Sequence, residues 1–362
     1  MGVFLTVIIA VLVFGFLIFI HEFGHYIFAR IFKVTINEFS IGMGPRLFSR
    51  RSKKTNIRYS IAAFPIGGYV AMAGEERDEG DTDSIFLNSE DDPNRFDRKP
   101  AWQRLIITLA GAFINILAGF LAMIIVVAAT KRPSLEVGAF LTEADEAKYG
   151  ITVTSDKWLD EGDEIVGVNG KSVSLYETFR YEVMRNGHKP LDVTVIRDGE
   201  RVTLEDVSFP ITVSEGQTFG TLDFKVHEKD KTFFGVLADS WGNLWLNVRM
   251  VWESLFDLIT GRYSFAAVSG PVGISAALGE AASYGFISLL NLVAMISINL
   301  GVMNLLPIPA LDGGRMITLL IEMITRKKLP PKVENTINAV GLMLLLGFSV
   351  IVLIKDVVGI FI

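Results

Sequence analysis

Two histidines and a glutamate lie within five residues of each other near the start of the chain, as His21, Glu22 and His25. In a helix, positions four apart lie on the same face, one turn above each other. Two neutral imidazoles in that arrangement can share a zinc ion, and the glutamate beside them can accept a proton from a water molecule that the metal activates. The His-Glu-x-x-His spacing therefore indicates metal-dependent hydrolysis, although the pattern alone also occurs by chance in unrelated proteins.

The residues before this motif predict that it lies in a membrane. Residues 3–20 are almost wholly apolar and carry no charge, which is long enough for a helix that spans the hydrocarbon. Ionisable side chains at that depth are costly, so their presence there predicts a function. The chain has only four histidines and no cysteine, so a metal site must also use carboxylates.

A candidate carboxylate follows a later apolar run. Residues 284–306 form a third uncharged span, which ends at Pro307, and Pro309 and Asp312 come directly after it. The two prolines break the helix. Irregular backbone at membrane depth is tolerated where it is buried in protein or lines a wet cavity. We therefore expect Asp312 to lie in such a setting.

The composition predicts membrane helices together with a water-soluble module. Half of the 362 residues are hydrophobic and the mean hydropathy is +0.42, yet 20% are charged. The net charge of -6 gives no indication of a nucleic-acid partner. The fold class that we expect is an α-helical membrane protein with four transmembrane helices, an inserted membrane-associated β-element and one α+β domain.

The segments between the apolar runs differ in character. Residues 33–100 contain short strand patterns at 36–45, 58–65 and 68–72, and the basic residues among them favour the cytoplasmic side. Residues 131–214 have hairpin signals at Asn-Gly and Asp-Gly pairs around a short helix, with acidic residues in excess. Residues 233–260 carry three tryptophans, and we expect an amphipathic helix on the membrane surface.

Two motifs together resemble the site-2 protease family of intramembrane zinc metalloproteases. They are His-Glu-x-x-His and, at residues 304–313, Asn-x-x-Pro-x-Pro-x-Leu-Asp-Gly. The resemblance is closest to the bacterial branch that includes the regulator of sigma-E protease, and it runs almost end to end. It also covers Gly67-Gly68-Tyr69-Val70, the Gly-x-x-x-Asn of Gly111 and Asn115, and the Ser-Gly-Pro-Val-Gly-Ile of residues 269–274.

The resemblance implies a role for each matching residue. Asp312 is expected to be the third zinc ligand beside His21 and His25, and Glu22 the catalytic base. Asn304 is expected to bind the substrate backbone or the oxyanion, with a helix cap as the alternative. Substrate binding is also expected at Gly67, Gly68 and Tyr69. Gly111 and Asn115 are expected either to contact substrate or to form an ordinary helix-packing face.

The module from Lys131 resembles a PDZ domain, with Asp160-Glu161-Gly162-Asp163 at that family's usual Pro-Gly-Asp turn. The expected location is the bacterial cytoplasmic membrane, with this domain on the outer side. The expected partners are single-pass membrane-protein substrates, such as anti-sigma factors or remnant signal peptides, and the lipid bilayer. The PDZ domain is expected to exclude bulky ectodomains or to bind peptide C-termini.

These expectations divide the chain into seven parts: 1–32, first transmembrane helix; 33–100, cytoplasmic β-region and acidic loop; 101–130, second helix; 131–214, PDZ domain; 215–283, amphipathic region; 284–325, third helix and Leu-Asp-Gly motif; 326–362, basic loop and fourth helix.

Two other functional classes remain possible from the residues alone. A transporter or channel would also place ionisable groups in the membrane, and a non-catalytic membrane scaffold would present a PDZ domain. A measurement of zinc bound to the purified protein would distinguish a metalloprotease from a transporter or channel and from a scaffold.

Overall fold

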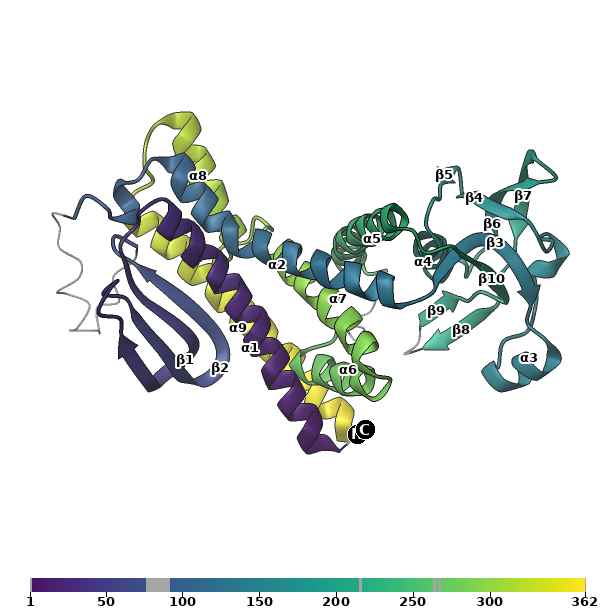
Figure 1. Ribbon diagram of the computed structural model, residues 1–362, viewed down its shortest axis with the longest axis horizontal. Coiled ribbons are helices and arrows are strands. Elements are labelled where there is room, and N and C mark those ends of the chain that lie inside the picture. Colours follow the sequence, from purple (N-terminus) through teal and green to yellow (C-terminus); the bar gives the residue numbers. More distant parts are fainter. Residues whose placement is uncertain (1, 76–91, 215–216, 263–264, 266–267, 362) are drawn as a thin grey trace. The chain divides into compact units, whose positions relative to one another are not determined.

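The computed structural model describes residues 2–75, 92–214, 217–262, 265 and 268–361 (Figure 1). The chain divides into two compact units. We call the first the membrane unit, which comprises Met1–Ala122 and Val268–Ile362. We call the second the sheet unit, which comprises Met123–Ala267.

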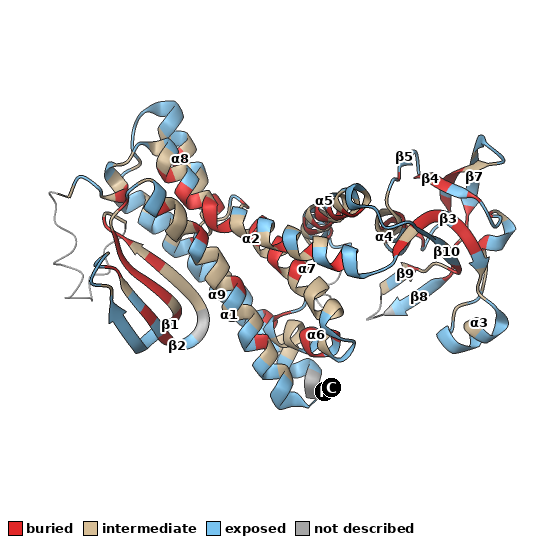
Figure 2. Cartoon of the chain, viewed as in Figure 1, coloured by how far each residue is buried: buried red, intermediate tan, exposed pale blue. Residues whose placement is uncertain are grey.

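Four of the described helices are long and apolar enough to cross a membrane, which confirms the expected number of spans. They are α1 (Val3–Ile31), α2 (Ala101–Ala129), α7 (Phe286–Asn304) and α9 (Pro331–Phe361). Large apolar side chains remain exposed along α1 and α9 (Figure 2). Such surfaces are stable against lipid and unfavourable in water, so the exposure agrees with a membrane location.

Small residues allow the helices of the membrane unit to pack closely. A Cβ atom on Gly24 of α1 would lie 2.5 Å from the carbonyl oxygen of Ala110 in α2. A Cβ atom on Gly301 of α7 would lie 2.7 Å from the carbonyl oxygen of Ala112. Only glycine permits these backbone approaches. The middle of α2 is thereby held between α1 and α7.

Two shorter helices complete this unit. Helix α6 (Pro271–Ser283) starts with proline at its first position, which suits a helix N-terminus. The backbone N–H of Gly273 donates a hydrogen bond of 3.1 Å to the Asp356 carboxylate of α9. The Ser-Gly-Pro-Val-Gly-Ile motif therefore starts a helix that α9 caps. Helix α8 (Asp312–Thr325) begins at Asp312 itself.

Two long bent strands, β1 (Ile36–Arg51) and β2 (Arg58–Met72), pack beside α1 (Figure 1). Glu38 pairs with both Ala71 and Arg58, so the first half of β1 lies between the two ends of β2. The strand patterns expected at 58–65 and 68–72 are thus parts of one strand. Gly67 lies between them with φ of 85°, a left-handed conformation that bends the chain without ending the pairing.

A buried glutamate, Glu38, connects the strands of this curled sheet. The Glu38 carboxylate accepts two hydrogen bonds from Arg46, at 3.0 and 2.8 Å, and one of 2.5 Å from Ser60 Oγ. Burial by itself raises the pKa of Glu38, but the donors of Arg46 and Ser60 favour the charged form and outweigh it. The net result is a pKa below the usual value for glutamate.

The sheet unit contains a sheet in the order β10-β3-β4-β6-β7. Its strands are β3 (Arg132–Phe140), β4 (Glu164–Val168), β6 (Leu191–Arg197), β7 (Glu200–Val207) and β10 (Phe224–Lys229), with β5 (Lys171–Ser172) paired to β4. The hairpin turns fall at the predicted Asn-Gly and Asp-Gly pairs, where Asn169 and Asp198 have positive φ. Strand β10 lies beyond residue 214 and completes the sheet by pairing with β3.

The remaining elements of this unit are α3 (Glu143–Tyr149), α4 (Tyr176–Asn186), the hairpin of β8 (Ile211–Ser214) and β9 (Gln217–Gly220), and α5 (Phe233–Ile259). The core contains fully buried residues from the strands and from α4, among them Val137, Ile165, Phe179 and Val193 (Figure 2).

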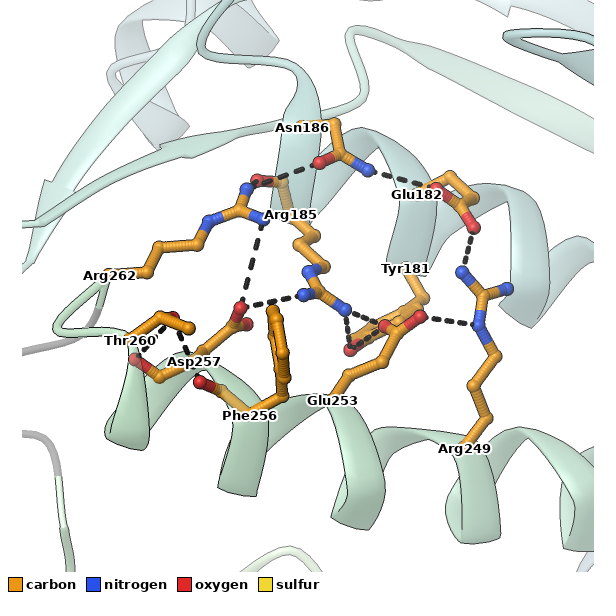
Figure 3. Close-up of polar contacts among 10 residues, drawn as sticks. All are labelled: Tyr181, Glu182, Arg185, Asn186, Arg249, Glu253, Phe256, Asp257, Thr260 and Arg262. Carbon is orange, nitrogen blue, oxygen red and sulfur yellow. Dashed lines mark hydrogen bonds and ion pairs between the residues drawn. The ribbon is translucent and has the colours of Figure 1, made fainter.

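An ionic network fixes α5 to α4 (Figure 3). Arg185 of α4 forms ion pairs with Glu253 and Asp257 of α5, the latter at 2.8 Å. Arg249 of α5 forms ion pairs with Glu182 of α4 and, at 2.7 Å, with Glu253. Because several of these groups are buried and share partners, α4 and α5 are held in one arrangement.

Candidate metal site

Helix α1 continues through the His-Glu-x-x-His motif, so His21 and His25 lie on one face as predicted. Their Nε2 atoms are 3.2 Å apart. Asp312 lies against both: its Oδ2 is 3.3 Å from Nε2 of His21 and 3.5 Å from Nε2 of His25. Within the part of the chain that the structure describes, these three side chains form the one group with the spacing of a metal site.

The loop between α7 and α8 delivers Asp312 to this position. It turns back on itself so tightly that a Cβ on Gly313 would lie 2.0 Å from the carbonyl oxygen of Leu306. A Cβ on Gly314 would lie 2.5 Å from that of Ile308. Glycines directly after Asp312 are therefore required by the close approach of the backbone. The Leu-Asp-Gly motif is a chain reversal that presents a carboxylate.

The donor set suits zinc. Two imidazole nitrogens and one carboxylate oxygen are common protein ligands of catalytic zinc, which keeps a further position for water. Oδ2 of Asp312 is buried and accepts no hydrogen bond from the described residues. A buried carboxylate oxygen without a donor is costly unless a cation binds it. The three side chains therefore fit a metal ion.

Residues of helix α2 contact the imidazole rings of both histidines. Nδ1 of His25 lies 2.8 Å from the carbonyl oxygen of Ile107, which can only accept, so Nδ1 carries the hydrogen and Nε2 is left for a metal. A Cβ atom on Gly111 would lie 2.4 Å from Nε2 of His25 and 2.7 Å from Cε1 of His21. Gly111 therefore leaves the space that both rings occupy.

Two asparagine amides meet the other face of His21. Nδ2 of Asn115 is 3.3 Å from Nδ1 of His21, and Nδ2 of Asn304 is 3.5 Å from the same atom. Asn304 is the last residue of α7 and lines the cavity described next. Asn115 is completely buried in α2 and does not line it.

A cavity of about 860 Å³ opens onto the three candidate ligands and Glu22. Cγ of Glu22 lies next to Gly68, where a Cβ would be 3.0 Å away. Residues 68–72 of β2 form one wall, and they include Gly68 and Tyr69 but not Gly67. The strand wall and the ionisable side chains thus face the same space.

Several contributors to this site were missed in the sequence. Helix α9 presents Asn335 and Asn338 to the cavity. The two asparagines are three residues apart at the start of an apolar helix, so they lie on the same side of it, and this pattern predicts a polar face. Arg315 of α8 forms an ion pair with Glu75 in the turn after β2, and the carbonyl of Ile107 orients His25. Neither of these contacts has a local sequence pattern.

Known proteins match this chain along nearly its whole length. A protein of Clostridium acetobutylicum, whose name assigns it to the zinc metalloproteases, is 35% identical over 356 residues, 98% of each chain. The zinc metalloprotease RasP of Geobacillus kaustophilus is 27% identical over 97% of each chain. The regulator of sigma-W protease RasP of Bacillus subtilis is 26% identical over 98% of this chain and 99% of its own.

The family comparison agrees with the geometry. The profile of peptidase family M50 matches residues 9–348, a range that contains the His-Glu-x-x-His motif of α1 and the Leu-Asp-Gly motif at the start of α8. Because that match covers most of the chain, the resemblance seen in the two motifs is confirmed at the level of the family. The chain belongs to peptidase family M50.

Proposed function

We propose that this chain is a zinc metalloprotease that hydrolyses peptide bonds within membrane-spanning segments of other proteins. One observation carries the proposal. Ionisable groups from α1 and α8 converge on a cavity although α1 is otherwise an uncharged span up to its motif. A transporter or channel would need such groups spread along a path, and a scaffold would have no use for Glu22.

His21, His25 and Asp312 are the proposed zinc ligands. When bound there, zinc supplies Lewis-acid activation of a water molecule and of the scissile carbonyl. Glu22 is not a ligand in this assignment; its carboxylate accepts the proton of the attacking water and returns it to the nitrogen of the leaving amine. Asn304 lines the cavity and donates a hydrogen bond to a substrate carbonyl.

Residues 68–72 are proposed to hold the substrate in an extended form. On one side they pair with residues 36–41 of β1. No other described strand pairs with their second edge, and these residues line the cavity. A helix hides its peptide bonds in internal hydrogen bonds, so the substrate must unwind before cleavage. An unwound segment can satisfy its backbone by adding to this edge.

The sheet unit is proposed to be a PDZ domain on the outer side of the membrane, where it excludes bulky ectodomains or binds a C-terminus. Its α5 exposes Trp241, Trp245 and Trp252, side chains that favour the membrane interface. The proposed substrates are single-pass proteins such as anti-sigma factors and remnant signal peptides. The name of the Bacillus subtilis relative, a regulator of sigma-W, motivates the first of these.

Cleavage by reconstituted protein tests the function. Wild type, Glu22→Gln and Glu280→Gln are purified, analysed for zinc and mixed in liposomes with tagged single-pass substrates of both classes. We expect Glu22→Gln to keep its zinc and to lose about 10²–10⁴-fold in cleavage rate. Glu280 is exposed on α6, so its variant should match the wild type. Normal cleavage by Glu22→Gln would show that another group is the base, and wild type without zinc or cleavage would refute the proposed function.

A further inference from the structure

The orientation of His21 determines which of its nitrogens needs support. Nε2 faces the other candidate ligands, at 3.3 Å from Asp312 Oδ2 and 3.2 Å from His25 Nε2. Nε2 is therefore the atom available to a metal. A neutral imidazole that binds metal through Nε2 carries its hydrogen on Nδ1. Nδ1 of His21 is then a donor, and it needs an acceptor in a buried setting.

The two histidines differ in how this need is met. His25 has a backbone acceptor, the carbonyl oxygen of Ile107. His21 has no backbone acceptor among the hydrogen bonds of the described residues, and its Nδ1 faces the side-chain amides of Asn115 and Asn304. One of these amides must supply an oxygen to Nδ1.

The side-chain amides of Asn115 and Asn304 differ in whether they line the cavity. Asn304 lines the cavity and can reach a substrate there. Asn115 is completely buried, lies closer to Nδ1, and does not line the cavity. Its backbone lies within helix α2, and its carbonyl oxygen accepts a further hydrogen bond of 2.8 Å from Ser297 Oγ. Asn115 can therefore act on His21 but not on a substrate.

The amide of Asn115 is free to present its oxygen. The oxygen and nitrogen of an asparagine amide have nearly the same shape, and hydrogen bonding decides which way the group points. Oδ1 of Asn115 is buried without a hydrogen-bond partner among the described residues. Rotating the amide by half a turn places Oδ1 at Nδ1 of His21 and breaks no hydrogen bond made by Oδ1.

We propose that Asn115 is a positioning residue for the metal site: its Oδ1 accepts the Nδ1–H of His21 and so holds the tautomer and the ring orientation that leave Nε2 to zinc. This inference rests on the proposed zinc site. It assigns the Asn of the Gly-x-x-x-Asn motif to the metal rather than to substrate, and it gives Asn115 the part that the Ile107 carbonyl has for His25.

Two variants of similar volume separate this role from packing. Asn115→Leu removes the acceptor without adding charge, and Asn115→Asp keeps an acceptor while adding a buried carboxylate. Loss of such an outer-shell partner typically weakens metal binding about 10–100-fold. We therefore expect Asn115→Leu to bind zinc 10–100-fold more weakly and Asn115→Asp to bind it at least as tightly as wild type. A packing role predicts the reverse order, since a buried carboxylate is the costlier change.

The measurement is zinc affinity of the full-length protein in detergent micelles, obtained by competition with a chromogenic chelator. The visible spectrum of the cobalt(II)-loaded protein reports ligand geometry and should change in Asn115→Leu only. Ser297→Ala is the matched control, because it removes a hydrogen bond to the Asn115 backbone and leaves the amide in place. It should match the wild type.

The possible outcomes distinguish a failure of the proposed zinc-protease function from a failure of the role proposed for Asn115. Wild type that binds no zinc would refute the proposed function itself. Wild type that binds zinc, with Asn115→Leu of equal affinity and spectrum, would overturn the role of Asn115 alone. If Asn115→Leu does not fold, Asn115→Asp decides: retained affinity supports an acceptor at this position, and weakened affinity refutes it.

Discussion

Nε2 of His21 lies 3.3 Å from Oδ2 of Asp312, and the two residues come from helices near opposite ends of the chain. No local pattern connects them. Their approach requires α1 to pack against α2 and the loop after α7 to reverse direction. The metal site is therefore a property of the whole membrane unit, and damage to its packing should be visible as loss of metal.

The first prediction concerns the ligands. His21→Ala and Asp312→Asn should each lower the zinc content of purified protein, because a site with two remaining protein ligands binds the ion weakly. His227→Ala is the control, since His227 is an exposed residue of β10. Metal analysis by mass spectrometry checks this. Full zinc retention in Asp312→Asn would remove Asp312 from the ligand set.

The second prediction concerns Gly111. In Gly111→Ala the new Cβ would lie 2.4 Å from Nε2 of His25, so the imidazoles must move and zinc affinity should fall. Gly15→Ala is the matched control because its Cβ meets nothing within 4 Å. Chelator competition on both proteins measures the difference. Equal affinities would mean that the space behind the histidines is not required.

The third prediction concerns topology. If the four candidate helices all cross the membrane, we expect both basic segments, residues 46–58 and 326–332, to lie on the cytoplasmic side and the sheet unit to lie outside. A reporter enzyme that works only outside the cytoplasm should be active when it is fused at Gly199, in the exposed β6–β7 turn. A reporter enzyme that works only in the cytoplasm should be inactive at the same position. Both reporters should behave in the opposite way when they are fused at Lys54, between β1 and β2. A cytoplasmic signal at Gly199 would contradict the arrangement.

The fourth prediction concerns the network between α4 and α5. Arg185→Gln removes the 2.8 Å partner of buried Asp257, while Glu253 keeps Arg249, and removing one member of a buried pair costs about 3–5 kcal/mol. Amide hydrogen exchange along α5 should therefore become faster. Arg180→Gln breaks an exposed pair with Glu177, worth at most about 1 kcal/mol, and should leave the exchange unchanged. Unchanged protection of α5 in Arg185→Gln would show that apolar packing alone holds it.

The fifth prediction concerns pH. The folded pKa of Glu38 lies below its unfolded value, which is about 4.3 for a free glutamate side chain. Its ion pair therefore contributes stability above that unfolded value and loses it as the pH falls through the folded pKa. Protease cleavage within β1 and β2 should increase on acidification, and Glu38→Gln should be susceptible already at pH 7. An equal pH response in Glu38→Gln would exclude Glu38 as the cause.

The sequence alone determined the features that depend on neighbours along the chain. The lengths of the apolar runs predicted the four membrane-spanning helices. The four-residue separation of His21 and His25 predicted that both lie on one face of a helix. Both inferences follow from helix geometry alone. Asn-Gly and Asp-Gly gave the hairpin turns, since few other residues adopt positive φ. Asp312 entered the site through the resemblance of its motif to a family and not through any spacing to His21.

Only the tertiary structure decided which distant groups meet. It joined the two later strand patterns into β2, because a glycine at positive φ bends a strand as readily as it ends one. It also paired β10 with β3, brought the Ile107 carbonyl to His25 and separated buried Asn115 from Asn304. The contacts of His25, Asn115 and Asn304 depend on which faces of α1, α2 and α7 pack together, and the pairing of β10 with β3 joins strands that are far apart in sequence. Packing is set by the shapes of many side chains at once, so no local pattern carries it.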